Sequence, residues 1–250
     1  MKVDKIILYD EPSVPEINLY SLRDFLKKNF PIDVEIRGNL FEKLDKTNLQ
    51  KIKDAQITDL KKPFEKQDHK SVKEKLSTEQ ILYDGFEIQK IISNSISEND
   101  DKTKNLHIIF TQQLVGTFSD EDFRYHARAL ISSNPSIIST SGIVEAPAKP
   151  KKYYLDLMTN FSGESVDSIK MKYKEQFVEY NDPRLGMIVE GYVLQSLIYY
   201  ETGESFCDQN YCRLFNAHWQ EELLSTQVRD RKFCDKHKKI ITKIANKKSN

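Results

Sequence analysis

The sequence predicts an α+β fold, in which a mixed β-sheet with flanking helices is followed by a helical C-terminal part. Three observations lead to this prediction. Residues 5–37 follow a strand–helix–strand pattern, and residues 106–111 form an apolar run whose composition is typical of a buried strand. Residues 182–203 carry apolar side chains around most of the circumference of a helix, as buried helices do.

The chain length sets the number of domains. A chain of 250 residues is long enough for one large domain or two small ones. Pro147, Pro150 and the lysines beside them are typical of a linker. We therefore expect a mixed α/β sheet subdomain over residues 1–150 and a helical subdomain over residues 151–250.

The N-terminal elements follow from short-range patterns. Residues 5–9 form a short apolar strand, and apolar side chains recur at helical spacing over residues 19–30. Pro31 ends that helix, because the residue before a proline is disfavoured in the α region. Residues 33–37 alternate between polar and apolar side chains, which predicts a half-buried strand.

The middle of the chain alternates between polar and apolar segments. A helix is expected over residues 49–60, before Pro63, and a second one through residues 81–91 with Ser77 as its cap. Residues 93–104 read as a polar loop, and residues 114–122 as a loop around Gly116. Strands are expected over residues 106–111, 125–132 and 136–140.

The C-terminal part contains one long helix with clear boundaries. Asp182 is a good N-cap, Pro183 suits the first helical position, and Gly203 is a typical stop. A last helix is expected over residues 216–228. The basic tail, residues 238–248, is interpreted as a solvated, fraying end.

All three cysteines lie near the C-terminus and a histidine completes them. Cys207-x4-Cys212 is followed, after 21 residues, by Cys234-Asp-Lys-His237. Two ligand pairs joined by a longer loop are typical of a tetrahedral zinc site, so we expect a structural Cys3His zinc. The alternative, three free thiols and an exposed histidine, leaves the spacing unexplained. Cysteines placed for a metal and not for disulfides fit a reducing cytoplasm.

The charge balance bears on the partners. The chain has 38 basic and 38 acidic side chains, so its net charge is zero and no global field attracts nucleic acid or an anionic membrane. The apolar run at the N-terminus is too short for a signal peptide, and no segment approaches the roughly 20 apolar residues of a membrane span. We expect neither a membrane nor a nucleic acid as partner.

These cysteines resemble part of a family signature. The archaemetzincins, zinc metallopeptidases of archaea, carry H-E-x-x-H-x-x-G-x-x-H, followed at once by C-x4-C and later by C-x-x-C. Here Cys207-x4-Cys212 and Cys234-x-x-His237 match the second half, with histidine for the last cysteine, and Gly203 matches the motif glycine. The resemblance implies a metzincin-like architecture and a structural zinc.

The catalytic half of the signature is missing. The resemblance places the three zinc histidines on Ser196, Tyr200 and Phe206, and the general-base glutamate on Leu197. Serine and tyrosine are poor zinc ligands, phenylalanine is none, and leucine cannot take a proton from water. The resemblance therefore implies a degenerate catalytic site.

A displaced metal site is the alternative. His218 and Glu222 are spaced i,i+4 on the last predicted helix, with Glu221 beside them, and could bind a metal from one face. His126 could supply a third ligand, and Glu221 or Glu145 is the candidate base. The simpler interpretation of the helical residues is packing by the His-Trp pair and a solvated glutamate pair.

The other histidines carry weaker interpretations. His126 stands between Arg124 and Arg128, which makes an anion or carboxylate binder, or plain surface, an equal interpretation. His107 lies in a strand and is expected in the core, and His69, in a charged loop, carries no prediction.

Three functions remain open at this point. The first is a metallopeptidase homologue that binds a peptide or protein without cutting it, with Ser139, Thr140 and Ile143 as the cleft-edge strand. The second is an active hydrolase with a second zinc at the displaced site. The third, a zinc-stabilised nucleic-acid binder, is supported only by the lysine tail.

Overall fold

Two small mixed sheets form the centre of the molecule. The structure is a computed structural model that describes residues 2–67, 80–97, 99–160, 163–204 and 206–246. The first sheet has the order β2-β1-β4-β8-β7, and only β7 runs antiparallel to its neighbour. Its strands are β1 Lys5–Tyr9, β2 Asp33–Arg37, β4 Asn105–Thr111, β7 Leu130–Ile131 and β8 Ser136–Ser139. The predicted α+β fold with a mixed sheet is confirmed.

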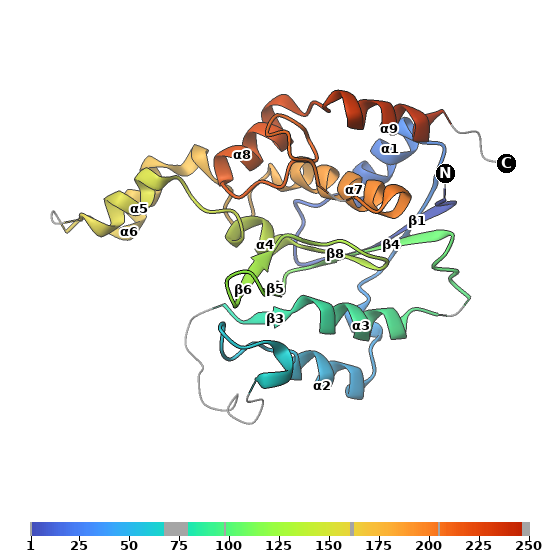
Figure 1. Cartoon of the computed structure of the whole chain (residues 1–250), viewed down its shortest axis with the longest axis horizontal. Coiled ribbons are helices and arrows are strands. Elements are labelled where there is room, and N and C mark those ends of the chain that lie inside the picture. The colour runs from blue at the N-terminus through green and yellow to red at the C-terminus, as the bar shows by residue number, and fades with distance from the viewer. Residues whose placement is uncertain (1, 68–79, 98, 161–162, 205, 247–250) are drawn as a thin grey trace.

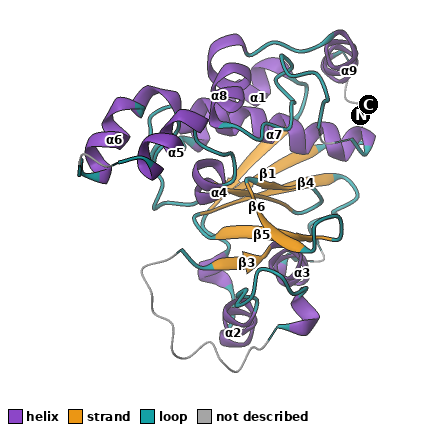
Figure 2. Cartoon of the chain, turned by 60° about the vertical axis from the view of Figure 1, so that its left-hand side comes forward, coloured by secondary structure: helices purple, strands orange, loops and turns teal. Residues whose placement is uncertain are grey.

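The second sheet has three strands and lies beside the first (Figure 2). It consists of β3 Leu82–Asp84, β5 Leu114–Ser119 and β6 Arg124–Arg128. β3 pairs parallel to β5, whereas β6 pairs antiparallel to β5 and forms one edge of the sheet.

Helices cover both faces of the larger sheet (Figure 1). α1, α7, α8 and α9 lie on one side, and α2 and α3 lie on the other. The α-helices are α1 Leu19–Asn29, α2 Lys46–Asp54, α3 Gly85–Ser95, α4 Thr140–Glu145, α5 Lys151–Met158, α6 Val166–Lys172, α7 Leu185–Thr202, α8 Gln220–Leu224 and α9 Asp235–Ala245.

The alternation of side chains along β1 produces this layering. Ile6 and Leu8 belong to the core shared with α1 and α7, whereas Ile7 and Tyr9 belong to the core shared with α2 and α3. Successive side chains of a strand point to opposite faces, so a strand with apolar residues at every position is buried on both sides. The first of these cores contains residues from both sides of position 150.

Helix α7 runs through the larger core. It is buried on almost every side, from Leu185 to Ile198, as its apolar circumference predicts. It ends at Gly203, whose φ of 85° is left-handed and suits glycine. The helix begins at Leu185, later than predicted, because Asp182 instead forms a turn by accepting the N–H of Arg184.

One predicted loop is a strand. Residues 114–119 form β5, and the prediction of a loop around Gly116 is wrong. A Cβ at Gly116 would lie 2.8 Å from the carbonyl oxygen of His126 on β6. The glycine therefore permits close approach of two strands and does not mark a turn.

Helix boundaries in the first half also differ from the prediction. α2 begins at Lys46 because the Asp45 carboxylate caps it, accepting the N–H of Asn48. Asp84 caps α3 in the same way. Ser77, the predicted cap, and His69 lie outside the described residues.

The predicted cleft-edge strand is wrong. β8 ends at Ser139, whose hydroxyl caps α4, and Thr140 and Ile143 are buried in that helix. β8 also lies between β4 and β7, so it is not an edge strand.

The C-terminal region holds more helix than predicted. α5 and α6 project from the body and share a small core of Tyr153, Ile169, Tyr173 and Phe177 (Figure 1). The basic tail does not fray over its described part: it forms α9, which buries Ile244. α8 begins at Gln220 and continues into a π-helix, Ser225–Asp230. None of the helices in the described ranges has both the length and the apolar character needed to cross a bilayer.

Candidate metal centre

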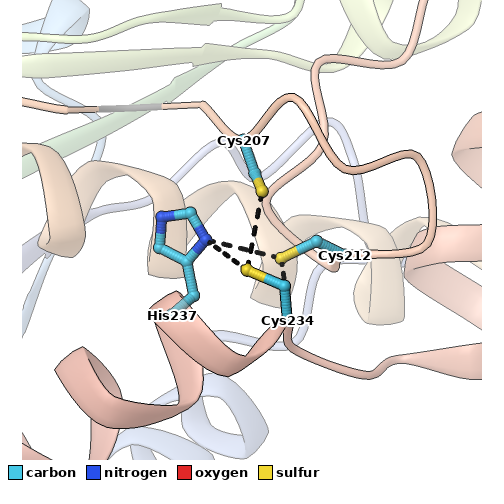
Figure 3. Close-up of side chains that lie close together, drawn as sticks. All are labelled: Cys207, Cys212, Cys234 and His237. Atoms are coloured by element: carbon cyan, nitrogen blue, oxygen red, sulfur yellow. Dashed lines mark hydrogen bonds between the residues drawn. The ribbon is translucent and has the colours of Figure 1, made fainter.

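Four predicted ligands meet at one buried point (Figure 3). The ligand atoms of Cys207, Cys212, Cys234 and His237 all lie within 4.8 Å of one another. None of the four residues is more than 7% exposed. Within the described part of the chain, no other group of three or more His, Cys, Asp or Glu side chains comes this close together.

Local structure explains how each ligand reaches this point. Cys207 follows the end of α7, and its backbone N–H donates to the carbonyl of Leu214 over 2.8 Å. Cys212 closes a turn in which its N–H donates to Gln209 over 2.9 Å. Cys234 is the N-cap of α9, and His237 lies in the first turn of that helix. One ligand pair therefore comes from a tight loop and the other from a helix start.

The distances between ligand atoms fit a tetrahedral ion. The sulfurs of Cys207 and Cys234 are 3.7 Å apart, and Nδ1 of His237 lies 3.6 Å from the Cys212 sulfur and 3.2 Å from the Cys234 sulfur. Tetrahedral zinc, with bonds of about 2.3 Å to sulfur and 2.0 Å to nitrogen, needs edges of about 3.8 Å between two sulfurs and about 3.5 Å between sulfur and nitrogen. The donor set and its spacing therefore fit zinc, with Nδ1 as the histidine ligand.

The environment sets the protonation of the ligands. Burial raises the pKa of the Cys207 thiol to about 12 and also raises that of Cys212. Burial acts the same way on Cys234, but the N–H groups of His237 and Lys236 and the hydrogen bonds with the Cys207 and Cys212 thiols together outweigh it and lower the pKa of that thiol. Burial lowers the pKa of His237, which favours the neutral imidazole that metals bind.

The positions of the missing catalytic motif are used for packing. Ser196 and Leu197 are fully buried in α7, and the Ser196 hydroxyl donates to the carbonyl of Tyr192 over 3.1 Å. Tyr200 donates its hydroxyl hydrogen to the carbonyl of Lys102 over 3.1 Å. This helix offers no metal ligand at these places.

The residues of the predicted displaced site are only partly brought together. His126, His218 and Glu145 line one cavity of about 680 Å³ beside β6. Glu221 and Glu222 line a different cavity, next to Lys151. The Glu222 carboxylate accepts the backbone N–H groups of His218 and Trp219 over 3.0 and 3.1 Å, so it caps its own helix. His126, His218 and Glu222 do not form a metal-binding group.

Sequence reasoning missed several partners of these residues. Asp122 accepts from Nε2 of His126 over 2.8 and 2.9 Å, and Tyr180 donates to Glu145 over 3.0 Å. The i,i+4 spacing of Asp122 and His126 was a usable signal, since both flank the start of a predicted strand. Nothing in the sequence links Tyr180 to Glu145, which lies 35 positions earlier.

A comparison with known families finds one whose model covers almost the whole chain. Over residues 2–244, the chain matches the model of a family described as "Probable metallopeptidase family (DUF6775)". No curated protein and no solved structure matches the chain.

Proposed function

The chain belongs to this probable metallopeptidase family, and from that premise we propose an archaemetzincin-like protein whose Cys3His zinc is structural and whose cleft binds a peptide without cutting it. The buried cluster of Cys207, Cys212, Cys234 and His237 carries the proposal. Four protein ligands fill a tetrahedral ion completely, which is typical of structural zinc. A catalytic zinc needs an open position for water or substrate.

Zinc at this site would connect distant parts of the C-terminal region. Cys207 follows α7, whereas Cys234 and His237 belong to the start of α9. A bound ion supplies a cross-link between these segments that the unfolded chain lacks, so its binding free energy stabilises the fold. Cysteines committed to one ion also support a reducing compartment such as the cytoplasm.

The degenerate site is supported by what fills the catalytic positions. Leu197, where the family base would stand, has no exposed surface, and Ser196 is equally buried. Without a carboxylate next to a metal-bound water, hydrolysis of a peptide bond lacks its general base. These replacements favour binding over cleavage.

A place for an extended ligand exists at strand β6. Two cavities lie beside this edge strand, and Ala127, Arg128 and His218 line both of them. We expect the peptide to lie along these cavities and not to add a full strand, because the N–H of Tyr125 on β6 already donates to the carbonyl of Leu60 over 2.7 Å. The zero net charge speaks against nucleic acid as the ligand.

A second candidate function is an active hydrolase with a second zinc. One observation favours it: His126, His218 and Glu145 line the same cavity. This function requires that Glu222 or another carboxylate leave its present partners, because Glu222 now accepts two backbone N–H groups. It also requires two zinc ions per chain.

Elemental analysis of wild type and His218→Ala, together with incubation of both with a mixed peptide library, separates these functions. One zinc per chain in both proteins, with no cleavage, is the result that we expect. Two zinc ions falling to one in His218→Ala, with cleavage lost, would replace our proposal by the hydrolase. A wild-type protein that contains no zinc would overturn both.

A further inference from the structure

A half-enclosed cavity lies between β6, α7 and the segment before α8. It has a volume of about 400 Å³, and we call it the Arg128 cavity after its only arginine. Its polar groups are mostly hydrogen-bond donors or neutral, and include Arg128, His218, Asn216, Tyr199 and Thr117. No aspartate or glutamate is among the described residues that line it. Its one fixed charge is therefore positive.

The guanidinium of Arg128 has no carboxylate partner. Nε of Arg128 donates to the Thr117 hydroxyl over 2.9 Å, and no carboxylate of the described chain lies within 4.0 Å of it. By contrast, Arg37, Arg184 and Arg213 each form an ion pair with an acidic side chain. Arg128 is partly withdrawn from solvent, and burial lowers its pKa. The charge of Asp122 attracts this guanidinium only from beyond direct contact, so an anionic ligand in direct contact would offset more of the cost of desolvating it.

The position of Arg128 is fixed by its surroundings. Its backbone carbonyl lies so close to α4 that a Cβ at Gly142 would come within 2.0 Å of it. Its side chain is held through Nε by Thr117 on the neighbouring strand β5, which leaves the two terminal nitrogens without a hydrogen-bond partner among the described residues. A guanidinium held in this way can present a fork of donors to a carboxylate at little entropic cost.

The rest of the cavity is apolar. Its apolar lining includes Phe86, Leu130, Ile131, Pro147 and Phe206. A hydrated inorganic ion would gain nothing from these walls, whereas a carboxylate attached to an apolar group would bury that group against them.

The neighbouring cavity has the opposite character. It shares Arg128, Ala127 and His218 with the Arg128 cavity, but Glu121, Asp122 and Glu145 also line it. Arg124 also lines that cavity, but its acidic side chains outnumber its arginines, so an anion is favoured in the Arg128 cavity. This difference restricts a carboxylate to the Arg128 cavity.

We propose that the Arg128 cavity binds a carboxylate carried by an apolar or aromatic group, with the Arg128 guanidinium as its counterion. Two sources share this chemistry, the C-terminal residue of a peptide and a free small carboxylic acid. The peptide source rests on the proposed peptide-binding function, whereas the free acid does not. Arg128 acts as a binding residue in both cases.

Isothermal titration of the zinc-loaded full chain tests the proposal. The probes are N-acetylphenylalanine, its amide, and a short peptide ending in phenylalanine with either a free or an amidated C-terminus. We expect each acid to bind at least tenfold more tightly than its amide, because only the acid forms a charge-assisted pair with Arg128. Equal affinity of acid and amide would overturn the proposal without the use of any variant.

Variants then assign the effect to Arg128. Arg128→Gln should weaken the binding of the acids at least tenfold and leave the binding of the amides unchanged. The affinity of Arg128→Lys for the acids should lie between those of wild type and Arg128→Gln. Arg124→Gln is the matched control, because it removes the same charge from the same strand but does not line the Arg128 cavity. Undiminished binding of the acids to Arg128→Gln, or tighter binding of inorganic phosphate than of any acid by wild type, would contradict the assignment.

The outcomes of these titrations, together with the zinc content, also distinguish a failure of this proposal from a failure of the proposed function. If peptides bind with no preference between free and amidated ends while one zinc is present, only the carboxylate site fails. If no zinc is found but the acid–amide preference remains, only the proposed function fails. Binding of N-acetylphenylalanine without binding of the peptide identifies a free acid as the ligand.

Discussion

The fourth ligand of the metal centre is a histidine where the resembling family has a cysteine. Its imidazole contributes Nδ1 to the cluster and carries no charge when it binds a metal, unlike a thiolate. Three thiolates and one imidazole leave a zinc site with one negative charge fewer than four thiolates. Such a site needs less compensation from its surroundings, which suits the almost fully buried position of His237.

Replacement of a single ligand should empty the site. Cys212→Ser is expected to reduce bound zinc from one per chain to almost none and to lower the free energy of unfolding by several kcal/mol, since ligand binding is coupled to folding. Elemental analysis and chemical denaturation measure both effects. His237→Cys is the matched control and should keep its zinc. A Cys212→Ser protein that melts cooperatively at the wild-type temperature without metal would contradict the assignment.

A second residue-scale prediction concerns His107, which is fully buried as the sequence indicates. Its Nδ1 lies 3.0 Å from the Tyr9 hydroxyl, and Nε2 has no hydrogen-bond partner in the described part of the chain. Burial lowers its pKa to about 4, against roughly 6.5 in an unfolded chain. Between these values only the unfolded chain takes up the proton, so stability falls as pH drops through this window.

Because of His107, the free energy of unfolding should fall by roughly 3 kcal/mol between pH 7 and pH 4. Denaturation of wild type and His107→Gln at several pH values measures it, since loss of zinc in acid affects both proteins alike. The slope of stability against pH should be smaller in His107→Gln over this range. Identical slopes would show that the imidazole does not remain neutral in the fold.

The sequence was most informative where function depends on local spacing. The Cys3His set could be predicted because each ligand pair spans one turn, and the loop between Cys212 and Cys234 is long enough to return. The set of His126, His218 and Glu222 could not be judged in this way. Glu222 is on the predicted helix, but the free N–H groups at the start of that helix attract its carboxylate more directly than a distant histidine does.

At the scale of elements, glycines decide how closely the strands and helices approach. Gly116 allows β5 to lie against β6, and Gly142 allows α4 to lie on the backbone of Arg128. Sequence patterns place such glycines in loops, which is why β5 was predicted as a loop. The same reasoning missed α4, because its six residues are too few for a helical period to show.

Gly142→Ala should destabilise the protein by roughly 2–4 kcal/mol, because the added Cβ meets a backbone atom that cannot turn aside. Chemical denaturation measures the loss. Gly38→Ala is the matched control, since nothing lies within 4 Å of its added Cβ, and should change stability by only about 0.5 kcal/mol. A Gly142→Ala protein as stable as this control would show that α4 and β6 are not in close contact.

On the scale of the whole molecule, the metal centre stabilises the upper layer, the helices α1, α7, α8 and α9 on one side of the larger sheet (Figure 1). α7 belongs to the large core along its length, and α9 adds Ile244 to the same core. The apolar contacts of α9 with this core come from Ile240, Ile241, Ile244 and Ala245 in its second half, so the attachment of its first turn depends on the ligands there. The lower layer, α2 and α3, contains no ligand.

Removal of zinc with a chelator should therefore loosen one layer and leave the other intact. Limited proteolysis followed by mass spectrometry should show new cleavage within residues 206–246, while residues 33–60 and 85–111 stay protected. Readdition of zinc should restore protection. Cleavage that spreads evenly along the chain after chelation would indicate that the whole fold depends on the ion.

The buried face of α7 also determines whether a catalytic centre could be engineered into this protein. Installing the full archaemetzincin motif would need histidines at Ser196, Tyr200 and Phe206 and a glutamate at Leu197. Two of these positions have no exposed surface, so the new imidazole would overfill the core and the new carboxylate would be a buried, unpaired charge. The substitutions that install the chemistry would thus unfold the scaffold, unless the core around α7 were first redesigned to open a water-filled cleft.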